Sequence, residues 1–418
     1  MRVAMLGAGF IGWGGGIDFL KAYLAPLQKM KDCEVYVFLP HDSVWRRLAR
    51  HLRYCFRTKF LHQNLGRYVA PCTTCELVKM FCSEHVHVVV YTVYWDVLSG
   101  LKRLLKEHRM DVIFPTLLDL GKDFPIPWIP YLPDLQHKYY PEFFSAEEIK
   151  ARDASFQQLL HSARSVVVEA EDVKKDLQKF YSVEDTKIFV MPYTAIPNRE
   201  WFLLNDVDLS SYHLPEKYFL ISNQFWLHKD HGTAFAALKL LRDAGYDKYH
   251  IVCTGKTDDY RDAAYFQQLL DGLRENHLEP YVHFLGYIPK IEQIKILCLA
   301  QAVLQPTLFE GNPGGGIAYH AIAMGVPILL SDIPVNLELR SPLVSFFKKQ
   351  DPESLKEAMM DLIIHRAELP SYSEEELLAQ GEARLEKLTR AVRDALLYSL
   401  GGANRDARDM DSAAETLS

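Results

Sequence analysis

The sequence has no long apolar run. None of its 418 residues lies in a stretch of about 20 consecutive apolar residues, the length that a membrane-spanning helix needs. The N-terminus passes directly from Met1 into a short apolar segment that is typical of a strand. It shows neither the longer apolar stretch nor the small-residue cleavage site of a signal peptide. We therefore expect a cytoplasmic location.

The sequence also lacks a cysteine framework and an excess of positive charge. Its 7 cysteines are odd in number and irregularly spaced, so they do not predict a set of disulfides. The formal net charge is −7, whereas binding to nucleic acid phosphates requires a basic face. Nucleic acid is therefore not expected as a partner. Aromatic residues, by contrast, make up 12% of the chain, which excludes a disordered protein.

Short apolar runs alternate with helical patterns along most of the chain. A proline-containing stretch at residues 191–197 interrupts this alternation and is typical of a linker. Strands that alternate with helices form parallel sheets covered by helices on both faces. The sequence therefore predicts an α/β protein with two Rossmann-like domains that face each other across a cleft. The predicted strands are residues 3–6, 35–39, 88–91, 112–114, 128–131, 165–169 and 188–191, then 218–222, 250–254, 283–285, 302–305 and 328–331.

The predicted domain boundary lies near residue 197. Residues 1–197 are assigned to an N-terminal domain and residues 198–384 to a C-terminal domain. The last helical pattern spans about residues 374–398, and its part at about 385–400 is expected to cross back to the N-terminal domain. The segment 401–418 is small, polar and charged, and we expect it to be disordered. Ligands of such sheets bind outside the carboxyl ends of the strands, so those loops should carry the site.

The strongest chemical signal lies between Gln305 and Pro327. A predicted strand is followed by Glu310, then by three consecutive glycines at a helix start, and the helix can end at Gly325. Glycines at a helix start expose backbone N–H groups, and the helix dipole adds partial positive charge there, a combination that binds phosphate. Glu310 can accept hydrogen bonds from sugar hydroxyls. The alternative interpretation is a tight turn with an exposed glutamate.

This segment resembles the donor-binding motif of the family-4 retaining glycosyltransferases, in which a Phe-Glu-Gly phrase precedes a helix that ends in Gly-x-Pro. The resemblance extends along most of the chain. Residues 222–231 resemble the first loop of that family's C-terminal domain, where a lysine, here Lys229, holds the donor diphosphate. Gly255 and Tyr287 lie in the next two strand-end loops, the second of which usually contacts the nucleotide base.

The resemblance implies a fold of the glycosyltransferase-B type and a hexosyl transfer from a GDP- or UDP-linked sugar to a glycan or lipid-linked acceptor. It also implies retention of the anomeric configuration, no required metal or other cofactor, and a place in surface polysaccharide biosynthesis. No pair of carboxylates suggests a double displacement.

The resemblance assigns residues to both walls of the cleft. Lys229 and the glycines would stabilise the departing diphosphate, Glu310 would recognise the sugar, and His137 would face the donor from the N-terminal domain; His137 could equally be satisfied within its own loop. The donor-binding residues are Gln224, Lys229, Gly255, Tyr287, Glu310, Gly311, Asn312, Gly314, Gly315, Gly316 and His320. The N-terminal wall comprises Gly14, Gly15, Gly16 and Asp134.

Two positions depart from the family pattern. When the motif is aligned on Gly325, His320 occupies the place of a second glutamate that binds the ribose hydroxyls. Gln224 replaces an arginine that usually binds phosphate. These departures leave open a catalytically weakened relative that binds sugar nucleotides.

The glycines at residues 7–12 suggest a second enzyme class, because their spacing matches a dinucleotide-binding pattern. An acidic residue should then end the second strand, but that strand ends at His41, and Asp42 comes late. An NAD(P)-dependent oxidoreductase is therefore the alternative, while Gly14, Gly15 and Gly16 better resemble the glycine loop of the glycosyltransferases.

The segment between Arg46 and Arg57 is basic in an acidic protein. Its apolar residues fall on one helical face with arginines around them, which suits contact with an anionic membrane. A helix that packs its apolar stripe while its arginines are solvated explains the pattern equally well.

Two weaker patterns complete the analysis. Cys72 and Cys75 form a single Cys-x-x-Cys pair, so a zinc site is not expected, and no metal ligands are assigned. Glu169 precedes an acid-rich helix start, which we interpret as helix capping and dipole compensation rather than binding.

Overall fold

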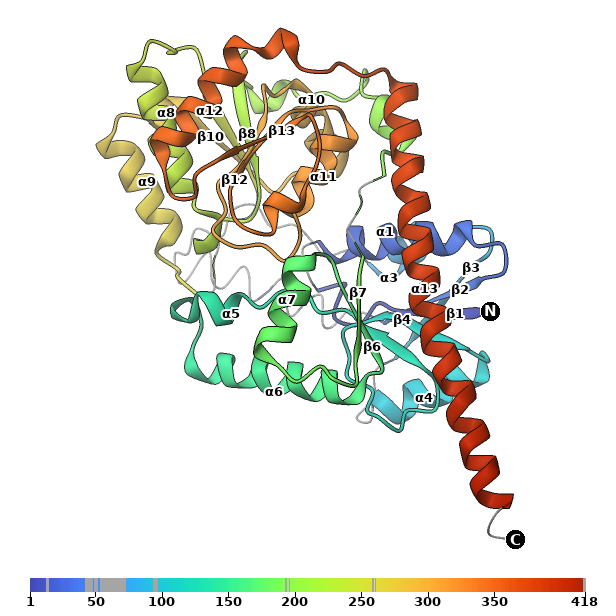
Figure 1. Cartoon of the computed structure of the whole chain (residues 1–418). Helices are drawn as coiled ribbons and strands as arrows, with labels where there is room; N and C mark the ends of the chain where they lie inside the picture. Colours follow the sequence, from blue (N-terminus) through green and yellow to red (C-terminus); the bar gives the residue numbers. More distant parts are fainter. Residues whose placement is uncertain are drawn as a thin grey trace.

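The computed structural model describes residues 1–12, 15–41, 73–92, 97–191, 194, 196–257, 259 and 261–415, together with Leu48 and Leu52. Figure 1 shows the two domains one above the other, with the last helix running along both. Gly14 lies outside the described residues. The same holds for the segment between Arg46 and Arg57, apart from Leu48 and Leu52.

The N-terminal domain is built on a parallel sheet with the strand order β3-β2-β1-β4-β5, which is a Rossmann order. Strands β6 and β7 pair in parallel, and a parallel bridge between Tyr131 and Val167 attaches them to the β5 edge. The strands are β1 (Arg2–Leu6), β2 (Glu34–Pro40), β3 (Val86–Tyr91), β4 (Val112–Thr116), β5 (Trp128–Pro130), β6 (Ser165–Val168) and β7 (Lys187–Val190). The helices are α1 (Gly16–Lys29), α3 (Thr74–Phe81), α4 (Val97–Glu107), α5 (Gln136–Tyr139), η1 (Pro141–Phe143), α6 (Ala146–Ser162) and α7 (Glu171–Phe180).

The C-terminal domain repeats this plan with the order β10-β9-β8-β11-β12-β13. Its strands are β8 (Tyr218–Ser222), β9 (His250–Thr254), β10 (Val282–Gly286), β11 (Val303–Gln305), β12 (Ile328–Ser331) and β13 (Val344–Phe347). Its longer helices are α8 (His231–Asp243), α9 (Tyr265–Glu275), α10 (Lys290–Leu299), α11 (Gly315–Ala323) and α12 (Pro352–Ile364). Short 3-10 helices are η2 (Arg199–Phe202), η3 (Ser210–Tyr212), η4 (Leu227–Lys229), η5 (Glu279–Tyr281), η6 (Asn336–Glu338) and η7 (Arg366–Glu368).

The two Rossmann-like sheets confirm the predicted fold class. The edge strand β13, which is short and only partly buried, was not among the predicted strands. The central strand β1 shows why these strands form where they do. Val3 and Met5 pack with α1 and α13, whereas Ala4 and Leu6 pack with α4 and α6, so both faces of the sheet are covered.

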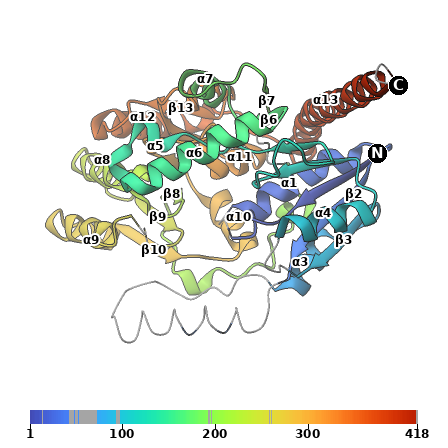
Figure 2. The ribbon, with the colours of Figure 1, turned by 90° about the horizontal axis from the view of Figure 1, so that it is seen from below.

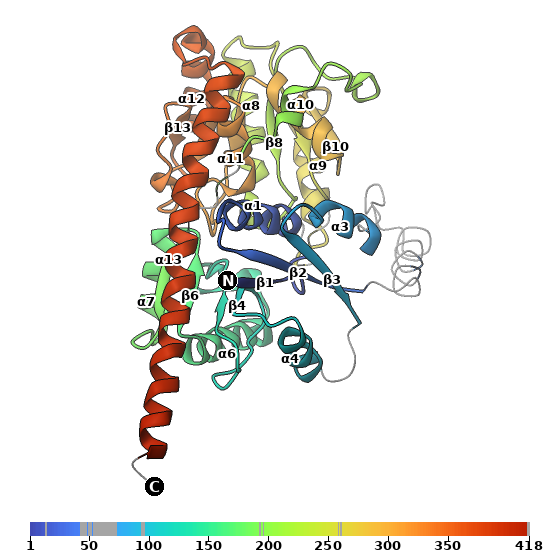
Figure 3. The same ribbon diagram turned by 90° about the vertical axis from the view of Figure 1, so that its right-hand side faces the viewer.

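The last helix, α13 (Glu374–Glu415), crosses from the C-terminal to the N-terminal domain, as Figure 3 shows. Leu388, Val392 and Leu396 lie in the core cluster of the N-terminal domain, and the hydroxyls of Ser165 and Ser399 are 2.8 Å apart. The helix continues through Glu415, so the structure has helical backbone where the sequence predicted a disordered tail from residue 401. The apolar repeat that predicts helices ends before that point.

A buried carboxyl group, Glu169, lies at the end of β6. The hydroxyls of Tyr131 and Tyr23 donate to it at 3.0 and 3.4 Å, and Tyr23 also reaches the carbonyl oxygen of Met191. Burial raises the pKa of Glu169 to about 8, although the two tyrosine hydrogen bonds act in the opposite direction. Glu169 is thus a protonated core residue at neutral pH, not the helix-capping residue that the sequence suggested.

This raised pKa predicts a pH-dependent stability. Between pH 5 and 8 the unfolded chain ionises Glu169 while the folded chain keeps it protonated, so the free energy of unfolding falls as pH rises, by at most about 1.4 kcal/mol per pH unit. We expect Glu169→Gln to remove this component when urea denaturation is measured across that range. Glu147→Gln, at an exposed position of α6, should leave the slope unchanged. Identical slopes for wild type and Glu169→Gln would contradict the assignment.

Candidate active site

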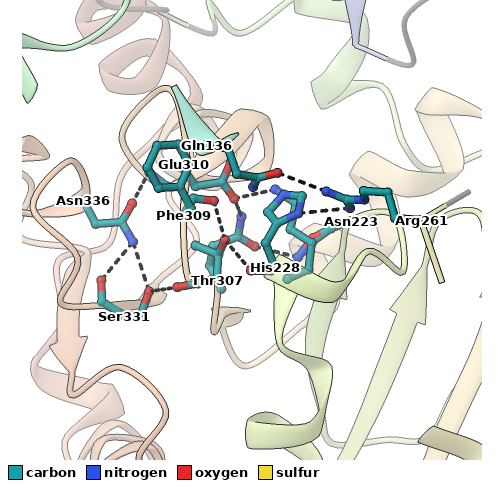
Figure 4. Close-up of polar contacts among 12 residues, drawn as sticks. Gln136, Asn223, His228, Arg261, Thr307, Phe309, Glu310, Ser331 and Asn336 are labelled. Atoms are coloured by element: carbon teal, nitrogen blue, oxygen red, sulfur yellow. Dashed lines mark hydrogen bonds and ion pairs between the residues drawn. The ribbon is translucent and has the colours of Figure 1, made fainter. Parts of the chain in front are cut away.

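The centre of the site is an ion pair between two loops of the C-terminal domain. Lys229, in η4 after β8, places its Nζ 2.5 Å from Oε1 of Glu310, in the loop after β11. Their side chains are only 12% and 9% exposed. Gln305 donates to the same oxygen at 3.1 Å, and Asn223 donates to Gln305 at 2.8 Å, as part of the network in Figure 4. The structure thus brings together the two residues that the sequence singled out.

The glycine-rich loop lies directly beside this pair. Gly314 and Gly315 have positive φ angles of 73° and 66°, which side chains other than glycine rarely adopt. A Cβ atom on Gly315 would lie 2.9 Å from the side-chain nitrogen of Gln305 and 3.3 Å from Glu310. The helix α11 starts at this point, so its positive end lies next to Glu310 and Lys229. Asn312 belongs to the same turn, since its carbonyl oxygen accepts from the Gly315 N–H at 3.2 Å.

A chain of buried hydrogen bonds holds this loop in place. Asn336, fully buried, accepts from the Gly314 N–H at 2.7 Å and donates to the Ser331 carbonyl at 2.9 Å. The Ser331 hydroxyl donates to the Thr307 carbonyl, and the Thr307 hydroxyl donates to the His228 carbonyl at 3.1 Å. The loops after β8, β11 and β12 are therefore tied together. Asn336 was not predicted, since no motif marks this single polar residue between Val335 and Leu337.

The other strand-end loops approach the site closely. Gly255 has a φ of 133°, and a Cβ atom there would lie 1.9 Å from the Asn223 carbonyl oxygen. Gln224, which follows Asn223 in the loop after β8, is half-buried. Tyr287, 45% exposed at the end of β10, lies 5.9 Å from the Lys256 ammonium, measured to the ring centre.

The two domains meet at Gly311. A Cβ atom on Gly311 would lie 2.0 Å from the carbonyl oxygen of Pro133 and 3.0 Å from the side chain of Asp134, both in the N-terminal domain. Asp134 accepts from the Gln136 N–H at 2.9 Å, which shapes the start of α5. Gly311 and Asp134, predicted for opposite walls, are thus neighbours.

Arg261, which the sequence analysis missed, also bridges the domains. It pairs with the buried carboxylate of Asp259 and donates to the side-chain oxygen of Gln136 in the N-terminal domain at 3.0 Å. It also lies 3.3 Å from Nδ1 of His228 and 5.3 Å from the Trp226 ring centre. Its loop is polar throughout, so no periodic pattern marks it.

His137 lies elsewhere than predicted. Its ring is buried inside the N-terminal domain, where Nε2 lies 2.9 Å from Asp153 of α6 and 3.3 Å from the Tyr181 hydroxyl. Burial lowers the pKa of His137, an effect that Asp153 partly opposes. The neighbouring residue Gln136 faces the C-terminal domain instead, because successive side chains of a helix point in different directions.

His320 joins a second chain of polar contacts between the domains. Its Nδ1 lies 2.7 Å from the Gly316 carbonyl oxygen and its Nε2 lies 3.5 Å from the Lys290 ammonium. Lys290, at the start of α10, pairs at 2.8 Å with Asp18 of α1; Figure 2 shows these helices side by side. Burial and the nearby Lys290 lower the pKa of His320 to about 4, so its ring is neutral.

The N-terminal glycine loop lies at the same helix start as Asp18. Gly15 is the N-cap of α1, and a Cβ atom on Gly16 would lie 1.9 Å from the Phe10 carbonyl oxygen. Glycine is therefore required at position 16 for the turn into α1.

Two other kinds of feature are absent from the described ranges. There, no three His, Cys, Asp or Glu side chains are grouped so that they could hold a metal ion. None of the helices in those ranges combines the length and apolar character that crossing a membrane requires.

Two parallel Rossmann sheets, with a last helix that returns to the first domain, form the fold of the glycosyltransferase-B class. Solved structures agree with this fold. The HepE protein of Anabaena in complex with UDP-glucose has a TM-score of 0.64 at 13% identity, covering 95% of this chain and 100% of that one. Sucrose-phosphate synthase of Thermosynechococcus elongatus has a TM-score of 0.61 at 15% identity, covering 98% and 100%.

Within that class, residues 211–376 match the family model described as glycosyl transferases group 1. This match covers most of the C-terminal domain. The O-antigen chain mannosyltransferase RfbU of Salmonella typhimurium is 25% identical over 234 residues. That match spans 55% of this chain and 59% of the relative's length.

The contact at Gly311 yields a stability prediction. Gly311→Ala should lower the free energy of unfolding by about 1–3 kcal/mol, because the added Cβ overlaps the Pro133 carbonyl and the domains must shift. Gly316→Ala is the matched control in the same segment, since a Cβ there meets nothing within 4 Å and alanine favours helix. Urea denaturation of both variants measures the difference, and equal stabilities would argue against a tight contact at Gly311.

Proposed function

We propose that this chain is a glycosyltransferase that moves a hexosyl group from a nucleotide-diphosphate sugar to a glycan or lipid-linked acceptor. The observation that carries the proposal is the nearly buried pair of Lys229 and Glu310 at the start of α11. A lysine ammonium and the positive end of a helix both stabilise a diphosphate. The group 1 family match over residues 211–376 supports the same reaction class.

The reaction needs positive charge beside the bond between sugar and diphosphate, which breaks in the donor. As the bond between sugar and diphosphate lengthens, negative charge grows on the departing diphosphate and the sugar becomes oxocarbenium-like. Lys229 is largely withdrawn from solvent, so its charge acts in a medium of low dielectric constant. The N–H group at Gly316 would add a hydrogen bond to a phosphate oxygen, whereas the Gly315 N–H already donates to the Asn312 carbonyl.

Glu310 would recognise the sugar. Both of its contacts, from Lys229 and Gln305, fall on Oε1, so Oε2 can accept a hydrogen bond from a sugar hydroxyl. Lys229 would move its hydrogen bonds partly to the diphosphate when the donor binds. The neighbouring Gln305 keeps the carboxylate oriented during this exchange.

We further infer retention of configuration, with the acceptor hydroxyl attacking from the face that the diphosphate leaves. Lys229 and the start of α11 would supply the positive charge that a metal ion supplies in other enzymes, so the reaction would require no metal. The cleft between the domains would hold the acceptor beside the donor and exclude water.

The donor is proposed to be a GDP- or UDP-linked hexose, and the product a surface polysaccharide. HepE was solved with UDP-glucose, and the curated relative is described as an O-antigen chain mannosyltransferase. His320, which the resemblance assigns to the ribose, is neutral and is already engaged by Lys290. The ribose hydroxyls would therefore meet the His320–Lys290 pair rather than a carboxylate.

The proposal predicts a specific loss of donor binding. Isothermal titration with UDP-glucose, GDP-mannose, an ADP-sugar, NAD and NADP should show binding of one sugar nucleotide. Lys229→Ala and Glu310→Ala should each weaken it by about tenfold or more, the expected loss of a hydrogen bond to a charged group. A coupled assay for the released nucleoside diphosphate, run with an acceptor extract and with EDTA, measures turnover.

Lys239→Ala is the control for the lysine change, since Lys239 pairs with Asp243 on the exposed side of α8. It should bind the donor as the wild type does. Binding of NAD alone would refute the glycosyltransferase and favour the oxidoreductase alternative. Tight donor binding without turnover would identify a catalytically weakened relative, the reading that Gln224 and His320 favour.

A further inference from the structure

A small cavity lined by both apolar and polar side chains lies away from the Lys229–Glu310 pair. It has a volume of about 180 Å³ and lies between α11, the segment 339–343 and the start of α13. Figure 3 shows α13 passing beside α11 at this level. Tyr319 of α11, Arg340 and Ser341 of the segment, and Gln380 and Arg384 of α13 contribute to its lining. Two cationic side chains thus converge on one small cavity.

Arg384 is the exceptional residue of this cavity. Its Nη2 atom is shielded from solvent and has no hydrogen-bond partner. Burial lowers the pKa of Arg384, which reflects the cost of holding its charge out of water. The neighbouring acids of the same helix, Glu382 and Glu386, approach Lys29 of α1 instead.

Arg340 is also without an ion pair in the part of the chain that the structure describes. Charged groups are seldom buried unless they are paired, because the desolvation cost is otherwise not offset. An anion in the cavity would supply the missing partner for the shielded Nη2 of Arg384, and the exposed Arg340 would reach the same anion from the rim. The planar fork of an arginine matches the oxygens of a phosphate group in a bidentate arrangement.

We propose that this cavity binds a phosphate group, as inorganic phosphate or as the phosphate of a small monoester. Arg384 would bind it from the floor and Arg340 from the exposed rim. The Ser341 hydroxyl, whose oxygen accepts from the Leu343 N–H at 3.3 Å, can donate its proton to the same anion. The volume is below that of drug-sized ligand sites, which favours a small anion over a nucleotide.

The position of the cavity gives such a ligand a structural role. The segment that contributes Arg340 and Ser341 directly follows Glu338, whose carboxylate accepts from the N–H groups of Glu171 and Asp172 at 2.9 and 2.7 Å. Those groups begin α7 in the N-terminal domain. The cavity therefore adjoins a contact between the domains but shares none of its lining residues with the proposed donor site.

The test is isothermal titration of the full chain with inorganic phosphate and, separately, with glucose 1-phosphate. We expect saturable binding at one site, weakened by about tenfold or more in Arg384→Met and in Arg340→Gln. Arg384→Lys should bind more weakly than the wild type but better than Arg384→Met, because it keeps the charge without the fork. Tighter binding of the monoester than of phosphate identifies a sugar-phosphate-like ligand, and equal binding identifies phosphate itself.

Two controls separate this site from the proposed donor site. Lys229→Ala should retain phosphate binding, and Arg384→Met should retain sugar-nucleotide binding and the wild-type melting temperature in phosphate-free buffer. Phosphate binding that is lost in Lys229→Ala but kept in Arg384→Met would place the anion at the donor site and overturn the proposal. Absence of saturable binding below about 10 mM would overturn it as well.

Discussion

The geometry of the proposed donor site depends on the ion pair of Lys229 and Glu310. Two nearly buried charges are tolerated only when each is paired and hydrogen-bonded, since their desolvation is otherwise not offset. This constraint accounts for Gln305, which donates to the same carboxylate oxygen. It also accounts for the left-handed Gly315, because any side chain there would press against the pair. The Asn336 side chain holds the adjoining Gly314 by accepting a hydrogen bond from its backbone N–H.

The placement of the two domains depends on contacts that lie close to this site. Gly311 of the donor loop touches Pro133, Lys290 pairs with Asp18, and Glu338 caps the start of α7. The helix α13 then joins the core of the N-terminal domain. The contacts between the domains and the proposed donor site therefore involve neighbouring residues.

Local motifs predicted which residues lie together where one segment carries all the information. The glycine loop and Glu310 follow one another in sequence, and the resemblance of the loop around Lys229 supplied its partner. His137 was placed wrongly because the direction of α5 decides which of two adjacent side chains faces the cleft, and Gln136 does. Arg261 was missed because a polar loop has no periodicity from which its partners could be inferred.

The sequence alone specified the alternating strands and helices, the two sheets and the glycine turns, because these follow from the spacing of apolar residues and from local backbone requirements. The spacing of apolar residues did not predict the partly buried edge strand β13. The tertiary structure decided which distant side chains meet. Lys290 reaches Asp18 and Arg384 reaches the cavity beside Arg340 only because strand order and the crossing of α13 bring those segments together. Hydrophobic periodicity encodes which face of an element is buried, but it does not encode which neighbour covers that face.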